Sequence, residues 1–587
     1  MSAFVLLREN DGADSDTALR AACQTLSEQG FAEAQEFKTA TWRVVAYPSL
    51  NGVPPAIVRA EADCFALAFG TLFYGDETGP AALDALRKAL RGGSVAWSQL
   101  GGTFCVIACD RGELQLITDA VGQYKVYRDP AWNVVSSSFL AVLATSAART
   151  PCVQGIYQYV FEGATFGEHT VVKEVCQLEG PVRVRLRDRV AVEPADIEIP
   201  RSYSDAPRER HVEEIGELLD RRFGAIAKHY AGHIATALSG GFDSRLILAQ
   251  LRRAGVVPDL HVYGSPQDAD VRVAKLIAAG EQLQLVHVDK ESPKNAERGT
   301  REQVVANNFL AFDGWPVDGI FDAGADVATR RQRARSGKIA LNGGGGEIFR
   351  NFFYMPDRPF SAQQLLWTFY SQFDAKCCTG AFRLPEYYES LSEALYRSLR
   401  IDAPRRLSRA EIELAYPFYR CRFWTGRNTS VNLRFGHSLT PFLELDLILR
   451  AAEVPLRYKN YGALEASLIE RADPALAGYT SAYGHAFDKP MRWRTRWRYA
   501  LETARPPSLR RLSFRLKRAL RPPPTPAALD ATGLNDVVDM RLPAMGAFFD
   551  VRRVHDPHQL ARIYSLEYLF AWHWRSQSWR VSSANVA

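Results

Sequence analysis

Apolar and polar residues alternate in short runs from Ala40 to about Leu143, a pattern that predicts strands rather than helices. The clearest runs are Trp42–Ala46, Phe104–Ala108, Leu114–Thr118 and Tyr124–Tyr127. One stretch, Ala81–Leu90, has apolar residues at helical spacing and predicts a helix between the strands. We therefore expect a β-rich, layered domain that extends to about Glu198.

The pattern changes after a Pro- and Ser-containing segment, 199–207, that is typical of a linker. From there predicted helices and strands alternate: helix Val212–His229, strand Ile234–Leu238, helix Asp243–Ala254, strand Leu260–Tyr263, helix Asp270–Ala279 and strand Leu283–Val288. This order favours right-handed crossovers and a parallel sheet covered by helices. From about Ser361 the chain is mainly helical, with apolar periodicity at Ala410–Trp424 and Leu560–Trp574.

The length of 587 residues requires at least two hydrophobic cores. We expect domains at residues 1–198 and 205–587. Hydrophobic residues make up 47% and charged residues 24%, close to the averages for folded soluble proteins. The net charge of +6 is small for this size, so composition predicts no nucleic-acid partner.

Nine scattered cysteines without metal-type spacing are typical of a reducing compartment. The first ten residues lack the basic and apolar regions of a signal peptide, and no apolar run is long enough to span a bilayer. We expect a cytoplasmic protein without a transmembrane segment.

The strongest chemical signal is the turn Leu238-Ser239-Gly240-Gly241-Phe242-Asp243-Ser244, where a predicted strand runs directly into a predicted helix. Consecutive backbone N–H groups and the positive end of a helix dipole would meet there, which favours an oligophosphate. Gly240 and Gly241 allow close approach of the backbone, and Ser239 and Ser244 add hydroxyl donors. Asp243 would hold Mg²⁺ against the phosphates. The alternative is an ordinary turn capped by Asp243 and Ser244.

These residues resemble the pyrophosphate loop of the N-type ATP pyrophosphatases, which split ATP between its α and β phosphates. The common Gly-x-x-x-x-Gly-Lys-Ser/Thr phosphate loop is absent. Three later segments are similar to motifs of asparagine synthetases: 262–270, 341–349 and 440–444. The four motifs occur in the family's order, and the resemblance covers about residues 205–480.

The resemblance implies roles for individual residues in these motifs. Tyr263 and Gly264 would lie at the adenine, and Asn342 and Gly343 would belong to the glycine-rich acidic loop. In the family an Asp of this loop helps to hold Mg²⁺, but here the corresponding places are glycines. Glu347 is the nearest carboxylate, so we expect Asp243 and Glu347 to bind the metal, with a helix-start glutamate as the alternative for Glu347.

Two further assignments concern the helical part. Lys459 lies near the place of a family lysine that neutralises charge at the α-phosphate, so Lys459 and Glu347 are the candidate catalytic residues. An ordinary solvated lysine is the alternative for Lys459. Glu444 and Asp446 are interpreted as structural. The usual base that deprotonates the attacking amine is missing, and no replacement is evident.

The amino-terminal part resembles an amidotransferase-type domain. Leu100–Phe104 and Asp119–Tyr124 look like segments of the domain that precedes the synthetase in class B asparagine synthetases, β-lactam synthetases and lasso-peptide cyclases. Glutamine-using members carry a nucleophilic cysteine after the initiator Met, whereas this chain has Ser2, and Phe69-Gly70-Thr71 stands in place of the glutamine clamp. Serine is a much weaker nucleophile than a thiolate. We therefore expect a non-hydrolytic domain.

Together these features predict an α+β N-terminal Ntn-type sandwich followed by an α/β parallel-sheet ATP pyrophosphatase domain with a helical C-terminal part. The implied activity is an ATP- and Mg²⁺-dependent ligase that adenylates a carboxylate before an amine displaces AMP. A peptide or specialised metabolite is the expected substrate, with a precursor peptide and its processing protein as possible partners. The alternatives are asparagine synthetase proper, a nucleotide-binding scaffold without turnover, and a tRNA-modifying enzyme.

The basic segment Lys489–Arg521 contains Trp493 and Trp497 and is followed by the proline-rich run 522–526. Arginine with tryptophan suits contact with an anionic partner, a peptide or a membrane surface. A solvated basic linker is the interpretation that the sequence alone favours.

Overall fold

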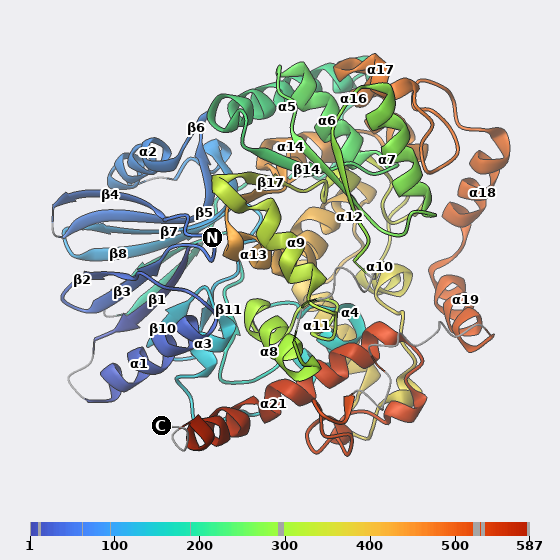
Figure 1. Cartoon of the computed structure of the whole chain (residues 1–587). Coiled ribbons are helices and arrows are strands. Elements are labelled where there is room, and N and C mark those ends of the chain that lie inside the picture. The colour runs from blue at the N-terminus through green and yellow to red at the C-terminus, as the bar shows by residue number, and fades with distance from the viewer. Residues whose placement is uncertain are drawn as a thin grey trace.

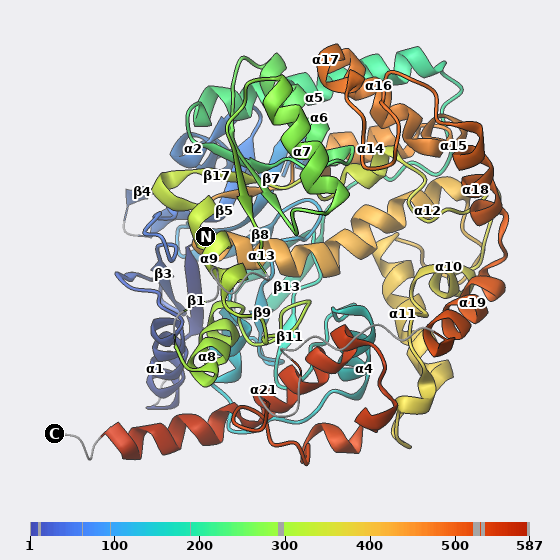
Figure 2. The same ribbon diagram turned by 45° about the vertical axis from the view of Figure 1, so that its right-hand side comes forward.

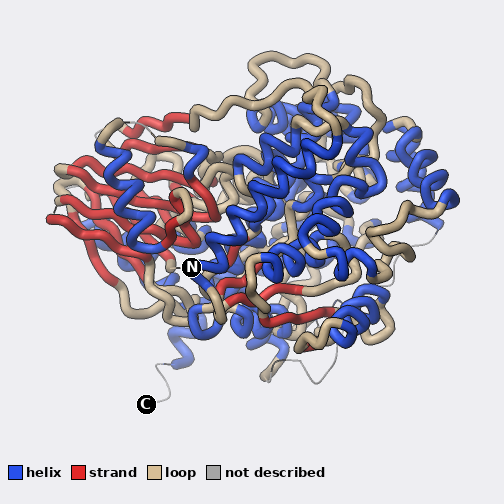
Figure 3. Tube along the Cα trace, turned by 90° about the horizontal axis from the view of Figure 1, so that it is seen from above, coloured by secondary structure: helices blue, strands red, loops and turns tan. Residues whose placement is uncertain are grey.

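The computed structural model describes residues 2–9, 13–61, 63–93, 95–187, 189–290, 297, 299–520, 529 and 534–583. The predicted proline-rich end of the basic segment, 522–526, lies outside the described residues. Figure 1 shows the strand-rich first third of the chain on the left and the helix-rich remainder on the right, and Figure 3 shows the same division from above.

Two antiparallel sheets form the first third of the chain. One has the order β11 (Cys176–Gln177), β9 (Tyr127–Arg128), β10 (Val134–Ser136), β1 (Ala3–Arg8), β3 (Trp42–Tyr47) and β2 (Gln35–Lys38). The other has the order β13 (Val190–Pro194), β12 (Val182–Leu186), β8 (Glu113–Thr118), β7 (Leu100–Asp110), β5 (Cys64–Tyr74) and β4 (Ala56–Glu61), with β6 (Glu77–Thr78) paired to β5. Four helices accompany them: α1 (Ala13–Glu28), α2 (Gly79–Arg91), α3 (Phe139–Leu143) and α4 (Val153–Glu162).

Alternation of side chains explains how the two sheets stack. Phe4 and Leu6 of β1 pack in one cluster with Phe65 and Leu67 of β5, so this side of β1 faces the second sheet. The intervening Val5 belongs to a different cluster, which includes residues of α1 and α2. The β-rich, layered domain predicted from the alternating pattern is therefore confirmed, and its two sheets are antiparallel.

One predicted strand is wrong. Tyr124–Tyr127 was expected to be extended, but β9 begins only at Tyr127. The buried carboxylate of Asp119 accepts hydrogen bonds from four successive backbone N–H groups, those of residues 121–124, at 2.8–3.1 Å. These bonds hold the segment in a tight turn, which apolar alternation cannot reveal.

The predicted parallel sheet is confirmed, with the order β16 (Leu285–Val288), β15 (Asp259–Tyr263), β14 (Ile234–Ala237), β17 (Ile339–Leu341) and β18 (Ser438–Leu439). All four pairings are parallel. The helices before and between these strands are α5 (Arg208–Tyr230), α6 (Asp243–Arg253), α7 (Ala269–Gly280), α8 (Arg301–Ala311) and α9 (Ala325–Arg333). The mixed α/β architecture thus follows the sequence expectation.

The remaining chain is helical, as expected. It contains α10 (Ala362–Phe369), α11 (Leu384–Ser398), α12 (Arg409–Ala415), a π-helical segment (Tyr416–Thr425), α13 (Gly426–Phe435), α14 (Leu445–Ala452), α15 (Leu456–Lys459), α16 (Ala463–Ala472), α17 (Pro474–Gly478), α18 (Trp493–Ala504), α19 (Pro507–Leu520) and α21 (Pro557–Ser583). Within the described parts of the chain, every helix is too short or too polar to cross a bilayer.

Candidate functional site

The loops that follow β14 and β17 lie at the same edge of the parallel sheet. The chain leaves β14 through α6 towards β15 on one side, whereas β17 pairs with β14 on the other side. Such a divergence of connections beyond the carboxyl ends of adjacent strands is the usual place for ligands in open α/β sheets. The topology therefore marks the turn 239–244 and the loop 342–347 as one candidate site.

These two segments are in direct contact through glycines. A Cβ on Gly343 would lie 3.0 Å from the Cβ of Asp243, and a Cβ on Gly346 would lie 2.0 Å from Asp243 Oδ1. Only glycine permits this approach. The structure thus brings together two motifs that are a hundred residues apart in the chain.

Three backbone amides of the turn donate to acceptors within the protein. Ser239 N donates to Ser244 Oγ at 2.9 Å, Gly240 N to Asp270 Oδ1 at 2.9 Å and Gly241 N to Ser239 Oγ at 3.2 Å. The two serine hydroxyls also bond to each other at 3.0 Å. A phosphate group at the turn would have to replace these internal acceptors on the three amides.

Arg350 lies among the carboxylates that were expected to bind Mg²⁺. Its Nη2 is 2.7 Å from Asp243 Oδ1 and 3.6 Å from Glu347 Oε1, and its Nε is 3.0 Å from Glu465 Oε2. In the described part of the chain, no three His, Cys, Asp or Glu gather into a group that could hold a metal ion. The donor types suit Mg²⁺, but as arranged they surround a guanidinium and do not fit a metal.

Burial determines the electrostatics of this cluster. Burial raises the pKa of Asp243 to about 6, against the opposing effect of Arg350. Burial also raises the pKa of Glu465 well above its usual range, and the nearby carboxyl of Asp243 adds to the rise. Arg350 itself stays charged despite burial, because Asp243 and Glu465 raise its pKa. In this cluster the charged Arg350 contacts two acids, Asp243 and Glu465, whose ionised forms are disfavoured by burial.

Glu347 has further partners within its own loop. It lies in a short 3-10 helix, Gly346–Phe349, and accepts hydrogen bonds from Gly345 N at 3.2 Å and from the hydroxyl of Tyr416. These contacts agree with the helix-start interpretation, and the metal role of Glu347 stays a prediction.

The remaining residues expected at the nucleotide lie around the same edge. Leu238 is fully buried, and its N–H donates to His261 O at 2.9 Å. Tyr263 lies at the end of β15, with Lys290 Nζ 4.5 Å from its ring centre. Gly264 has a φ of +127° and accepts a hydrogen bond from His287 at 2.8 Å, whereas Asn342 Oδ1 accepts one from Gly344 N at 2.9 Å.

Lys459 is not a solvated surface lysine. Its side chain is 1% exposed, and Nζ donates to Glu413 Oε2 at 3.0 Å. Burial lowers its pKa, partly offset by Glu413. The next residue, Asn460, accepts a hydrogen bond from Asn351 at 3.0 Å, and Asn351 follows Arg350 in the chain. Lys459 is therefore adjacent to the cluster around Arg350, but its amino group bonds to Glu413. Its role at a phosphate stays a prediction.

Glu444 and Asp446 have structural contacts. The buried Glu444 accepts a hydrogen bond from Gly102 N at 3.1 Å and forms an ion pair with Arg222 at 3.2 Å. It joins the predicted 440–444 motif to the predicted 100–104 motif across the two parts of the chain. Asp446 pairs with Arg221 at 2.7 Å near the surface.

Ser2, Phe69 and Thr71 are all buried. Ser2 directly precedes β1. Phe69 packs against Phe4 with ring centres 4.8 Å apart, and the Thr71 hydroxyl accepts a hydrogen bond from Ser438 N at 3.3 Å. At the place of the family's glutamine clamp, Phe69 therefore makes an aromatic contact, and Thr71 accepts a hydrogen bond from the second half of the chain.

Sequence reasoning missed Arg350 and Glu465 and gave Asp270 no role of its own. Arg350 follows Glu347 by three residues, a spacing that allows an ion pair within one helical turn. Glu465 stands among Leu464, Leu468 and Ile469 on the buried side of α16. A lone carboxylate on an apolar helix face is the signal that could have identified it.

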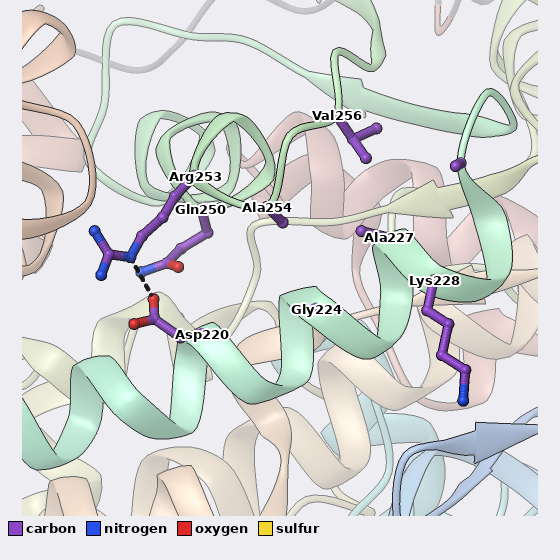
Figure 4. A pocket seen from close by; sticks show the side chains of 9 residues that line it. Asp220, Gly224, Ala227, Lys228, Gln250, Arg253, Ala254 and Val256 are labelled. Carbon is purple, nitrogen blue, oxygen red and sulfur yellow. Dashed lines mark hydrogen bonds and ion pairs between the residues drawn. The ribbon is translucent and has the colours of Figure 1, made fainter.

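Several cavities lie outside the cluster. One of about 900 Å³ has apolar walls that include Phe312 and Phe321 and polar groups that include Lys290, Arg330 and Arg427. Lys290 also covers the ring of Tyr263, so this cavity borders the predicted adenine side of the site. Another, of about 500 Å³, lies between α5 and α6, and Figure 4 shows Asp220 and Arg253 pointing towards one another in it.

Comparison with known proteins gives little beyond this geometry. No protein-family model and no curated protein matches the chain. A structure described as the allosteric regulatory enzyme of purine biosynthesis matches with 12% identity over 51% of this chain and 82% of its own, at a TM-score of 0.22. Glutamine phosphoribosylpyrophosphate amidotransferase from B. subtilis, complexed with ADP and GMP, matches with 10% identity over 60% and 77%, also at 0.22. At these values neither neighbour assigns a family or an activity.

Proposed function

We propose that the chain is an ATP-dependent carbon–nitrogen ligase of the asparagine synthetase type, with its nucleotide site at the turn 239–244. The observation that carries the proposal is the meeting of this turn with the loop 342–347 beyond adjacent parallel strands. That position is where open α/β sheets bind ligands.

The internal hydrogen bonds of the turn are compatible with a nucleotide site in which protein acceptors occupy the amides that would bind phosphate until a nucleotide replaces them. Gly240 N already donates a hydrogen bond to a carboxyl oxygen of Asp270. A phosphate group could replace Asp270 there, since helix N-termini favour anions in general. Arg350 would then be available to a phosphate, because guanidinium groups bind phosphate and carboxylate oxygens alike.

The reaction class follows from the chemistry of carboxylates. An acid oxygen attacks the α-phosphorus of ATP and pyrophosphate leaves, and an amine nitrogen then attacks the acyl carbon and AMP leaves. Ser2 and the Phe69 contact give no support to glutamine as the amine donor. We therefore propose an amine supplied by the substrate, a peptide or specialised metabolite, and the 900 Å³ cavity beside Lys290 is large enough for such a molecule.

One experiment tests this proposal. The full chain is incubated with Mg²⁺, ATP and a panel of amino acids and short peptides, and pyrophosphate and AMP are measured. We expect release with at least one acid, and a loss of about 100-fold or more in Asp243→Ala. Asp259→Ala is the matched control, because Asp259 is exposed at the amino end of β15. Equal activity in Asp243→Ala would refute the assigned site.

A second candidate function is nucleotide binding without turnover. Arg350 favours it specifically, because it fills the position between Asp243 and Glu347 where a metal was expected. If ATP binds but none of the acids causes release of pyrophosphate, the second candidate replaces the first.

A further inference from the structure

Two helices at the edge of the molecule, α18 (Trp493–Ala504) and α19 (Pro507–Leu520), form a surface that the proposed function does not use. Figures 1 and 2 both place them at the right-hand side, away from the antiparallel sheets. We call them the α18–α19 surface. Together they make up most of the basic segment 489–521, which the sequence analysis interprets as a solvated linker.

An apolar stripe on this surface faces outwards. In α18, Trp493, Trp497 and Leu501 recur every four residues and are 64–67% exposed. In α19 the exposed leucines are Leu509, Leu512, Leu516 and Leu520. Seven of the fourteen large hydrophobic side chains that the structure leaves exposed, within its described residues, lie on these two helices. A solvated linker would not be expected to expose so many large apolar side chains close together.

The opposite faces of the two helices attach them to the body of the protein. The Tyr499 hydroxyl donates to Asn460 Oδ1 at 3.4 Å, and its ring lies 4.6 Å from that of Tyr461. Arg510 donates to Phe353 O at 2.9 Å, and Arg511 lies 5.7 Å from the ring of Trp367. These contacts fix the orientation of the helices, so the apolar stripe stays turned towards solvent.

Positive charge flanks the stripe on both sides. At helical spacing, Arg492 and Arg496 fall on one flank of the α18 stripe and Arg494 and Arg498 on the other, and all four are exposed. Residues 489–521 contain twelve Lys and Arg and one acidic residue, Glu502, in a chain of net charge +6. The segment therefore carries +11 and the rest of the chain −5.

We infer that the α18–α19 surface binds the face of an anionic lipid bilayer. A strip of Trp and Leu flanked by arginines is the pattern of a helix that lies in the plane of the interface, with its apolar side in the acyl boundary and its cations at the phosphates. A nucleic acid would satisfy the arginines but leave the leucine stripe in water. The inference does not depend on the ligase proposal.

The segment 460–461 is one of the links between the surface and the candidate site. Tyr499 of α18 contacts Asn460 and Tyr461, which follow Lys459 directly. Attachment to a membrane would therefore place the helical side of the candidate site close to the bilayer, where an amphipathic substrate would be concentrated.

Co-sedimentation of the full chain with vesicles tests this inference. We expect the chain to sediment with phosphatidylcholine vesicles that contain phosphatidylserine, at roughly 0.15 M salt, and much less with phosphatidylcholine alone. A variant with Trp493→Ser, Trp497→Ser, Leu512→Ser and Leu516→Ser should bind at least about tenfold more weakly. The control, Val257→Ser with Leu276→Ser, removes exposed apolar side chains elsewhere and should bind like the wild type.

Two results would overturn the inference. One is the absence of binding to the phosphatidylserine vesicles. The other is equal binding of the wild type and the quadruple variant to these vesicles, which would show attraction by charge alone. Because the substituted side chains are exposed, circular dichroism should show the same folded state for all variants.

Discussion

Arg350 is the residue on which the candidate site depends most. It is the shared cation of Asp243, Glu347 and Glu465, and two of these acids are costly to ionise because they are buried. Removing a partner from a buried ion pair leaves uncompensated charge in a poorly solvated place.

We predict that Arg350→Met lowers the free energy of unfolding by about 3 kcal/mol. Urea denaturation at neutral pH measures this change. Arg541→Met is the control, because Arg541 is exposed and forms a surface pair with Asp539, and its effect should stay within about 0.5 kcal/mol. An Arg350→Met protein as stable as the control would show that the guanidinium is not a required counter-ion.

Glu444 gives a prediction of pH dependence. Burial raises its pKa to about 7 from an ordinary value of 4.5, although Arg222 acts in the opposite direction. The folded protein therefore binds this proton more tightly than the unfolded chain, and the stabilisation is complete below about pH 4.5 and lost as the pH rises to about 7.

Glu444→Gln should remove this contribution, so unfolding free energies measured across that pH window should fall less steeply than in the wild type. Glu113→Gln, at an exposed carboxyl, should keep the wild-type profile. Parallel profiles for Glu444→Gln and the wild type would contradict the assigned titration.

Residue roles were harder to predict than residue positions. The turn 239–244 and the loop 342–347 were identified from sequence, because glycines between a strand and a helix leave a local signature. The acceptors that close the turn, such as Asp270, and the counter-ion Arg350 come from other segments. Their positions depend on tertiary contacts, which no local pattern contains.

Elements were predicted well wherever one face of a strand or helix is buried. The five strands of the parallel sheet include the three predicted ones, with ends shifted by one or two residues. β17 and β18 were not predicted as strands, because each has only two or three residues. The failed strand at Tyr124 shows the same limit, since a side-chain cap from Asp119 overrides alternation there.

The junction of the two loops gives a prediction at the scale of elements. Gly346→Ala places a Cβ 2.0 Å from Asp243 Oδ1, so the loop after β17 must move away from α6. We expect a loss of stability of about 2 kcal/mol, measured by thermal unfolding. At Gly344 the nearest atom to a Cβ would be 3.5 Å away, so Gly344→Ala should change stability by less than about 1 kcal/mol. Equal effects of the two substitutions would refute the close junction.

At the scale of the whole molecule, Asp313 holds the two parts of the chain together. It accepts hydrogen bonds from Gln29 Nε2 at 3.0 Å and from Phe139 N at 2.7 Å, and Arg427 lies 3.6 Å away. The carboxylate thus links the sandwich to the helical part from a buried position.

We predict that Asp313→Asn destabilises the whole protein by about 3 kcal/mol, since the buried Arg427 would lose its counter-ion. Fluorescence-monitored denaturation measures this loss. Asp318→Asn, at a highly exposed carboxylate nearby, should behave like the wild type. A wild-type curve for Asp313→Asn would show that the two parts are held together by other contacts.

Calorimetric titration of the full chain with ATP in the presence of Mg²⁺ measures whether the turn 239–244 binds the phosphates of ATP. Binding at this turn predicts one nucleotide per chain with a dissociation constant on the order of micromolar. It also predicts at least about tenfold weaker binding by Gly240→Ala, because a Cβ there would lie 2.7 Å from Ala482 Cβ. Absence of binding by the wild type at about millimolar ATP would contradict the account.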